Sequence, residues 1–249
     1  KSILGTILQE NGVTDWSPLF SEAHPAREFC VQYGETDYDF LARMAAEEGL
    51  FFYEEHSPDS DDQSLVLCDT VRFLPEAFDI PWNPNTRTEV STPCISQFRH
   101  SAQIRPSSVI GKDYTFKRPG WAGRFEQQGQ NQDYQRTQYE VFDYPGRFKD
   151  GHGQNFARWQ VEGWRNNAEE AQGESRSPAI WPGRRIQLTE HPQAGLNREW
   201  QVVSSDLQGK QPQAVAGRSG SGTTLENDFT VIPADRTWRP RPMEKPSVD

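Results

Sequence analysis

One segment of the chain combines helical and extended hydrophobic spacing. It reads VQYGETDYDFLARMAAEEGLFFYEE over residues 31–55. Its first apolar residues recur at helical spacing and fall on one face of a predicted helix: Phe40, Leu41, Met44 and Ala45. The unbroken LFFY that follows predicts a strand. The polar HSPDSDDQ and the apolar SLVLCD then predict a loop and a second strand, which gives a helix–strand–loop–strand unit.

The ends of this predicted helix carry residues that suit helix termini. Thr36 or Asp37 can accept hydrogen bonds from the free N–H groups of a first turn. Asp37 and Asp39 also place negative charge at the positive end of the helix dipole. Gly49 follows the last apolar residue and can take the positive φ that ends a helix.

The middle of the chain favours extended structure over helix. Four prolines within residues 73–93 predict an extended linker or an irregular crossing, because proline lacks the N–H that a helix uses. Alternation resumes in CISQFRHSAQIRP, where we expect Ile95, Phe98 and Ile104 to point inward. The Gln- and Gly-rich residues 119–138 predict a surface loop.

In the second half of the sequence, the patterns predict short strands and one further helix. QYEVFDYPGRF predicts a strand closed by a turn at Pro145–Gly146. An apolar stripe predicts a helix over residues 153–172, although Gly163 weakens it. Further strands are predicted in RRIQLTE, REWQVVSSDLQ, QAVAGR and NDFTVIP. The chain is therefore expected to be mostly β and mostly antiparallel with helical insertions, an α+β class.

Composition narrows the possible partners. The 249 residues carry a net charge of −10 with scattered basic residues, so we expect no nucleic-acid partner. The sequence contains no run of about 18 apolar residues, so we expect no membrane span. The first residues, KSILGTILQE, lack a Met and a signal-peptide layout, so we expect a piece of a longer protein. Cys30, Cys68 and Cys94 match no metal or redox spacing and predict buried free thiols of a protein folded in a reducing cytoplasm, rather than disulfides.

Two carboxylate doublets, Glu47–Glu48 and Glu54–Glu55, are the candidates for catalysis. Glycoside hydrolysis needs two carboxylates facing each other across about 5 to 10 Å. Neighbours on a helix point about 100° apart and neighbours on a strand point to opposite faces, so neither doublet is a pair by itself. One member of each doublet can still converge across the helix–strand junction. We expect instead that all four are solvated.

No other motif predicts chemistry. The five histidines show no ligand spacing, and neither HExxH nor GxSxG is present. GRSGSG at residues 217–222 lacks the Lys of a phosphate-binding loop and predicts a flexible turn. Most of the eight tryptophans are expected in cores or interfaces. The sequence thus predicts no catalytic residue, no metal site and no cofactor.

Several motifs resemble those of the VgrG proteins, the spike proteins of type VI secretion, which are related to late-control tail proteins of contractile phages. The segment from Gln32 to His56 resembles the family's most typical stretch, and FDYPG at residues 142–146 resembles its DYPG motif. PGRRIQLTEHP and LNREWQVVSSDLQG resemble its late strand pair. VIPADRTWRP and EKPSVD resemble the approach to its oligosaccharide-binding (OB) domain. The departures, such as Gly34 at a usually charged position, are mild.

The resemblance implies the hub part of a spike, built from two antiparallel β-barrel-like domains of the phage-tail-hub type. It implies residues 1–94 as the end of the first barrel region, residues 95–235 as a second barrel-like domain with an inserted helix, and residues 236–249 as a proline-rich linker to an OB domain. It also implies a homotrimer of the full-length protein that joins the Hcp tube to the spike, with baseplate components and effectors as further partners. Such a protein is cytoplasmic before firing and is then secreted. The alternative is a carbohydrate-binding or carbohydrate-processing module, suggested by the aromatic and acidic content.

Overall fold

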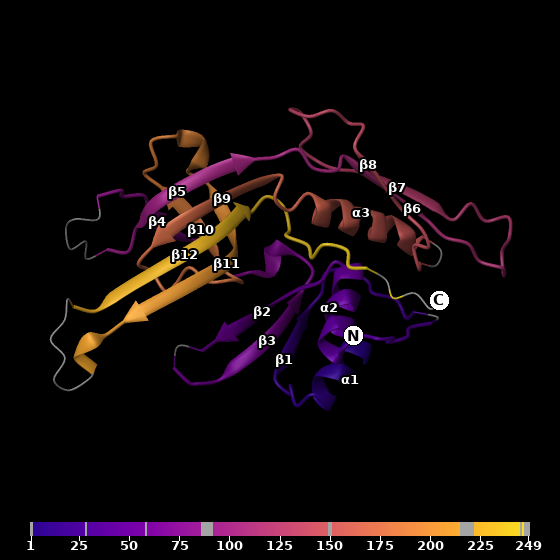
Figure 1. The fold of residues 1–249 in the computed structure, drawn as a ribbon, viewed down its shortest axis with the longest axis horizontal. Coiled ribbons are helices and arrows are strands. Elements are labelled where there is room, and N and C mark those ends of the chain that lie inside the picture. The colour runs from indigo at the N-terminus through magenta and orange to yellow at the C-terminus, as the bar shows by residue number, and fades with distance from the viewer. Residues whose placement is uncertain are drawn as a thin grey trace. The chain divides into compact units, whose positions relative to one another are not determined.

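The computed structural model describes residues 2–27, 29–57, 59–85, 92–148, 151–214, 222–244 and 246. The chain, which Figure 1 colours by residue number, divides into two compact units. Unit 1 comprises residues 1–70, 103–168 and 237–249, and unit 2 comprises residues 71–102 and 169–236. Each unit is therefore assembled from segments that are distant in the sequence.

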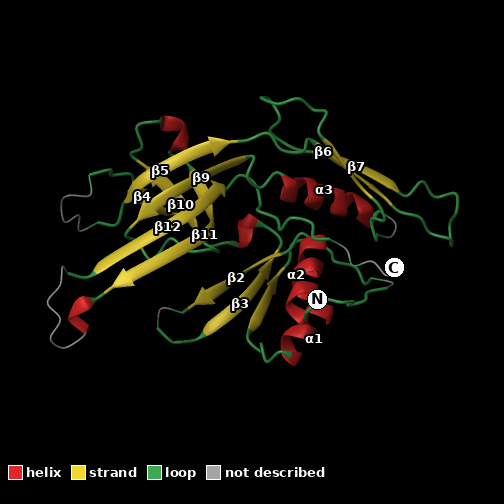
Figure 2. Cartoon of the chain, in the orientation of Figure 1, coloured by secondary structure: helices red, strands yellow, loops and turns green. Residues whose placement is uncertain are grey.

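The described residues form three α-helices and twelve strands, which confirms the mostly β class with helical insertions (Figure 2). The helices are α1 Ser2–Glu10, α2 Asp37–Glu47 and α3 His152–Trp164. The strands of unit 1 are β1 Trp16–Leu19, β2 Phe51–His56, β3 Gln63–Cys68, β6 Ser108–Lys112, β7 Arg124–Gln128 and β8 Glu140–Asp143. The strands of unit 2 are β4 Phe78–Pro81, β5 Ile95–Ala102, β9 Glu169–Ser175, β10 Arg185–Thr189, β11 Glu199–Lys210 and β12 Thr224–Pro233.

Helix α2 begins and ends where the sequence predicts. Thr36 Oγ1 accepts a hydrogen bond from Asp39 N at 3.1 Å, which caps the first turn. Gly49 has a φ of +66°, and a Cβ there would lie 2.6 Å from the ring of Trp159. The buried face of α2 packs with α1 and with Leu67 of the sheet β1-β3-β2. The predicted helix–strand–loop–strand unit is therefore confirmed.

A second sheet of unit 1 has the order β7-β6-β8, and α3 packs on one of its faces. Gln154 of α3 donates to Gln127 of β7, and Gln160 donates to Asp143 of β8. Phe148, Phe156 and Trp159 form the buried core beneath the helix. Because side chains alternate along a strand, Phe142 points to the face opposite α3.

Unit 2 contains one six-stranded sheet with the order β4-β10-β11-β12-β9-β5. β4 and β10 are parallel, and the other neighbouring pairs are antiparallel. A bridge joins Trp82, just after β4, to Ile95 at the start of β5, and Asn83 N donates to Ile95 O at 2.8 Å. Since β4 and β5 are the two ends of the strand order, the sheet curls back on itself into a barrel-like wall.

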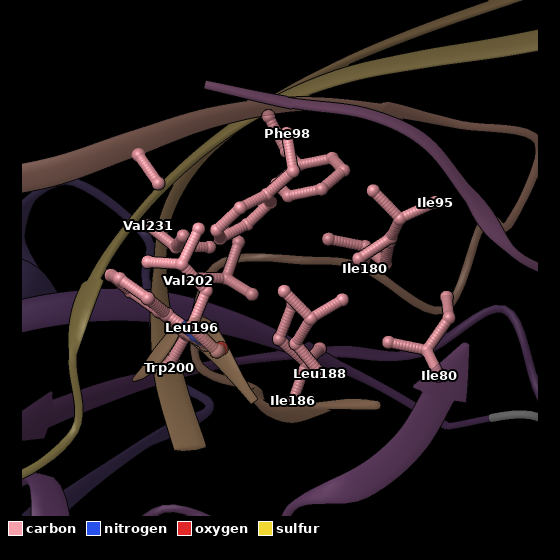
Figure 3. Packing of buried hydrophobic residues seen from close by; sticks show 12 residues of the cluster. Ile80, Ile95, Phe98, Ile180, Ile186, Leu188, Leu196, Trp200, Val202 and Val231 are labelled. Atoms are coloured by element: carbon pink, nitrogen blue, oxygen red, sulfur yellow. The ribbon is translucent and has the colours of Figure 1, made fainter. Parts of the chain in front are cut away.

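Twelve buried residues fill the inside of this wall (Figure 3). They alternate along the strands, as Ile186 and Leu188 do on β10. Trp200 is the largest of them, is 0% exposed, and donates from Nε1 to Leu196 O at 3.0 Å. Its ring meets that of Phe98 edge-on, with centroids 5.2 Å apart. The indole thus buries its apolar surface without leaving its one polar group unpaired.

Several predicted boundaries were wrong. The helix expected over residues 153–172 ends at Trp164, because residues 169–175 pair on both sides as β9. Ile104 is 59% exposed, since β5 ends at Ala102. Residues 119–138, expected to be a surface loop, contain the strand β7, whereas the strand β4 in residues 73–93 agrees with the extended alternative for that segment. QAVAGR begins within a 3₁₀ turn, Pro212–Ala214, and its remaining residues lie outside the described part of the chain.

We expect Gly173→Ala to destabilise unit 2 by about 1–3 kcal/mol, the usual cost of overpacking. A Cβ at Gly173 in β9 would lie 2.3 Å from Cζ of Phe229, whose ring lies in the core. Urea unfolding followed by circular dichroism measures the change. Gly209→Ala in β11 is the matched control, because its Cβ would meet Leu225 Cδ1 at an ordinary 3.6 Å. Equal effects at the two glycines would contradict this packing.

Candidate functional site

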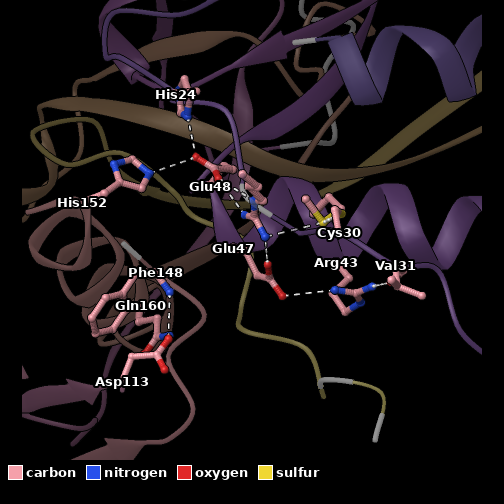
Figure 4. A network of polar contacts seen from close by, with 12 residues as sticks. His24, Cys30, Val31, Arg43, Glu47, Glu48, Asp113, Phe148, His152 and Gln160 are labelled. Atoms are coloured by element: carbon pink, nitrogen blue, oxygen red, sulfur yellow. Dashed lines mark hydrogen bonds and ion pairs between the residues drawn. The ribbon is translucent and has the colours of Figure 1, made fainter. Parts of the chain in front are cut away.

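A buried polar network of unit 1 centres on Glu48, directly after α2 (Figure 4). His24 Nδ1 donates to Glu48 Oε2 at 2.9 Å, and His152 Nε2 of α3 lies 3.4 Å from the same oxygen. Arg27 contacts the other oxygen, with Nη2 2.6 Å from Oε1. A carboxylate that meets three donors in a buried place acts as a tie between the three segments that supply them.

The network continues along α2 through two arginines. Arg27 Nη1 donates to Glu47, and Arg43 Nη1 donates to Glu47 Oε1 at 3.2 Å. Arg43 also makes a fork with Glu35, with Nη2 2.5 Å and Nε 3.0 Å from its two oxygens. Acidic and basic groups therefore alternate from Glu35 to Glu48, which offsets the cost of burying them.

Burial alone would raise the pKa of Glu48, but its partners outweigh burial. Hydrogen bonds from His152 and His24 and the charge of Arg27 favour the carboxylate, so its pKa lies well below the ordinary value of 4.5. The group is ionised at neutral pH. A buried carboxylate with this pKa is a poor proton donor, so Glu48 is not suited to act as a general acid.

The two carboxylate doublets therefore have different surroundings. Glu54 and Glu55 are exposed on β2, as expected. The expectation that Glu47 and Glu48 are also solvated was wrong, because Arg27, Arg43 and the two histidines cover them. The partners of Glu47 and Glu48 come from loops and from α3, and neither member of the exposed doublet joins them in the described contacts.

A second buried polar group of unit 1 is the guanidinium of Arg239, near the C-terminus. Arg239 is 4% exposed, and its guanidinium donates to Gly49 O at 2.9 Å, to Asp69 O and to Glu162. Its backbone N donates to Asn166 Oδ1 at 2.9 Å, and Asn166 donates back to Arg239 O. One side chain thus joins the end of α2, the end of β3 and the end of α3.

Unit 2 has an ionic cluster of its own. Glu169 lies between Arg198, Arg236 and His100, with His100 Nε2 3.0 Å from Oε1. Burial opposes ionisation, but the hydrogen bonds from Arg198 and His100 lower the pKa of Glu169. Because this charge sits at the start of β9, the cluster pins the point at which the chain enters the sheet.

The remaining candidates for chemistry are the possible metal ligands, the tryptophans and the cysteines. No group of three or more His, Cys, Asp or Glu side chains that could hold a metal is found among the described residues. All eight tryptophans are buried or half-buried, which leaves no exposed indole for sugar stacking. Cys68 is a buried free thiol, as expected, but the expectation of burial was wrong for Cys30 and Cys94, which are half-buried free thiols. No helix in the described ranges is long and apolar enough to cross a membrane.

Exposed apolar side chains gather in unit 1 instead. Of the fifteen large hydrophobic residues that are exposed in the described part of the chain, only Phe73 and Leu207 belong to unit 2. Ten of the thirteen in unit 1 are aromatic: Phe29, Tyr33, Tyr38, Phe52, Tyr114, Phe116, Tyr134, Tyr139, Phe142 and Tyr144. Aromatic residues are enriched in protein–protein interfaces, so these side chains are candidates for contacts with a partner.

Residues 1–213 match the phage tail baseplate hub (GPD) family, and the chain belongs to this family. It is 41% identical to the actin cross-linking toxin VgrG1 of Vibrio cholerae and 39% identical to the type VI secretion system spike protein VgrG3 of that species. Both matches cover 99% of this chain but only 23% and 24% of the relatives. The chain thus spans about a quarter of these relatives, and the resemblance to VgrG proteins is confirmed.

Two solved structures share the fold. An E. coli component of the type VI secretion system, described as similar to T4 tail proteins, has a TM-score of 0.65 at 18% identity, covering 98% of this chain and 52% of that one. A tail protein from Neisseria meningitidis MC58 has a TM-score of 0.59 at 14% identity, covering 92% and 65%. The expected fold of phage-tail-hub type is therefore confirmed.

Proposed function

We propose that this chain is a structural, non-catalytic hub segment of a type VI secretion spike. The observation that carries the proposal is the match of 99% of the chain to proteins named as type VI secretion spike proteins. The ionic networks support it, because they join distant segments and leave their carboxylates ionised and paired. A hub that transmits force to a spike needs such cross-links more than it needs a pocket.

The proposal extends to the assembly of the full-length protein. The hub forms a homotrimer and binds the Hcp tube. The linker of residues 236–249 connects it to an OB domain. Residues 1–94 and 95–235 are then parts of two barrel-like domains. The protein waits in the cytoplasm and leaves by type VI secretion, with effectors and baseplate components as further partners. The exposed aromatic residues of unit 1 support contacts of this kind.

We expect the full-length protein to sediment as a trimer. Each 1,000 Å² of apolar surface buried between subunits contributes up to about 25 kcal/mol before the costs of association. Analytical ultracentrifugation over a range of concentrations measures the mass. A strictly monomeric full-length protein would refute the proposal.

The competing function, a carbohydrate-binding or carbohydrate-processing module, rests on the exposed Tyr and Phe rings and on Glu54 and Glu55. Glycan cleavage that disappears in Glu54→Gln and Glu55→Gln variants would favour it. The exposed doublet is the right place for that test, because variants of Glu47 and Glu48 also break the buried network.

A further inference from the structure

Six strands lie at sheet edges in the described part of the chain: β1, β2, β4, β5, β7 and β8. An edge strand presents unpaired backbone groups, and another chain can pair with them unless the edge is protected. Backbone groups of alternate residues point to the same side of a strand, so the hydrogen bonds inside each sheet show which residues face its free edge. Four of the six edges carry features that block or discourage pairing, whereas the backbone edges of β5 and β8 are left open.

Proline and charge protect three of these edges. Pro18 of β1 and Pro81 of β4 face the free edge, because Leu19 O and Trp82 N, one residue further on, bond inward. Proline has no N–H to donate to a new neighbour, so it stops a ladder at that point. β2 instead ends in three consecutive ionisable residues, 54–56, and charged side chains on an edge discourage pairing.

Side-chain amides occupy the edge of β7. Gly129 N donates to the residue just before β6, so Gln128 and Glu126, one and three residues away from it, face outward. Gln127 Nε2 donates to Gln128 O at 3.1 Å, and Gln154 Nε2 donates to Glu126 O at 3.2 Å. Two outward carbonyls of β7 are therefore already satisfied from within the chain.

The edge of β8 has no such protection. Tyr139 O accepts a hydrogen bond from Ser107 N at 2.6 Å, so Tyr139 and Val141 point to β6, and Glu140 and Phe142 face the other side. No described strand pairs with β8 on that side. The Phe142 side chain is 60% exposed, and no described basic residue pairs with the exposed Glu140. The edge thus offers backbone donors and acceptors together with an aromatic ring and a negative charge.

The edge of β5 is open as well and carries the opposite charge. Gln103 N donates at 2.9 Å to the residue just before β9, so Phe98, His100 and Ala102 present their backbone groups on the other side. The bridge to β4 lies at the first residue of β5 and leaves these three without a described neighbour there. Arg99 is exposed on this strand, and no described carboxylate pairs with it.

We infer that β5 of one copy of this chain pairs in parallel with β8 of a second copy. In a parallel pair, a residue that faces the partner strand lies beside one that faces away, so Arg99 comes to lie beside Glu140 and Ser101 beside Phe142. An antiparallel pair would put Arg99 and Glu140 on opposite faces of the sheet. The backbone bonds supply affinity, and the opposite charges select the direction and the register.

The connection between β5 and β6 excludes this pairing within one copy. Only residues 103–107 separate the two strands. With β8 between them, β5 and β6 would be parallel, and a parallel crossover needs about a dozen residues or more. The contact is therefore head-to-tail between copies and can close a ring. The inference rests on the proposed function and adds to it the strands by which copies meet.

Photo-crosslinking in the full-length protein tests this contact. Two copies with different affinity tags are co-expressed, and only one carries benzoylphenylalanine in place of Phe142. We expect irradiation to join this position to a peptide within residues 95–105 of the other copy. Benzoylphenylalanine in place of Tyr134, a ring of unit 1 that is 101% exposed, is the control and should not label that peptide. A trimer that cross-links from position 142 to another segment would overturn the strand pairing and leave the proposed assembly intact, whereas a monomer would overturn both.

A proline substitution tests the backbone bonds separately from the ring. The probe now replaces Ser101, and the partner copy carries either Phe142→Pro or Phe142→Ala. Both variants lose the ring, but only proline loses the outward N–H, and the bonds of β8 to β6 remain. The yield with proline should be about tenfold lower than with alanine. Equal yields in two folded variants, checked by circular dichroism, would overturn the pairing.

Charge exchange tests the register. Arg99→Glu in the copy with the probe at position 101 should lower the cross-linking yield by about tenfold, because two carboxylates then lie side by side. Glu140→Arg in the other copy should restore it. Both side chains are exposed, so the variants are expected to fold. A yield that does not fall with the first substitution, or that the second fails to restore, would contradict the placing of Arg99 beside Glu140.

Discussion

Trp200→Ala is expected to lower the free energy of unfolding of unit 2 by about 3–5 kcal/mol, the range for truncating a large core aromatic residue. Trp200 is 0% exposed inside the curled sheet of unit 2. Its removal leaves a cavity between Phe98 and Leu196, and the carbonyl of Leu196 loses its indole donor. The surrounding strands belong to one hydrogen-bonded sheet, so they cannot collapse far into the space.

Urea unfolding followed by far-ultraviolet circular dichroism measures this loss without relying on tryptophan emission. Tyr134→Ala, at a ring that is 101% exposed in unit 1, is the control for losing an aromatic residue, and its expected change is within about 0.5 kcal/mol. Similar losses for both variants would mean that Trp200 is not the centre of the core.

Glu48→Gln is expected to lower the free energy of unfolding of unit 1 by about 1–3 kcal/mol at neutral pH, since Arg27 then keeps only Glu47 as a carboxylate partner and the two histidines lose the charge that they face. The same variant should change the pH dependence. Because the folded pKa of Glu48 lies below its ordinary value of 4.5, its contribution is complete above that value and is lost as the pH falls below it. The wild-type chain should therefore lose more stability than the variant between pH 5 and pH 3.

Denaturant unfolding at several pH values between 3 and 7 tests both statements. Glu55→Gln is the matched control, because Glu55 is an exposed neighbour of the other doublet. It should leave the acid slope unchanged. An unchanged slope in Glu48→Gln would show that the ion pairs of Glu48 do not contribute to acid sensitivity.

Local patterns predicted α2 and the paired strands β2 and β3 correctly, because the cap at Thr36 and the positive φ at Gly49 depend on neighbours in the sequence. The end of α3 was missed because residues 169–175 gain more by pairing with β5 and β12 than by extending the helix. Helix α1 and strands β1 and β6 were not predicted, since each is short and gains its stability from tertiary packing.

The Glu48 network was beyond pattern analysis for a different reason. His24, Arg27 and His152 approach one carboxylate from sequence separations of 24, 21 and more than 100 residues. No spacing rule relates positions so far apart, and a doublet of carboxylates looks the same in a solvated helix face and in a buried ion pair. Only the alternation of Arg and Glu around α2 hinted at buried partners.

The buried guanidinium of Arg239 has a mechanical consequence. Its side chain donates hydrogen bonds to Gly49, Asp69 and Glu162, and its backbone exchanges two hydrogen bonds with Asn166. All of these bonds hold the chain at the same residue. A pull on the residues that follow must break them together, instead of peeling them one after another. A pulling force applied to the residues after Arg239 is therefore distributed at the same time over the ends of α2, α3 and β3.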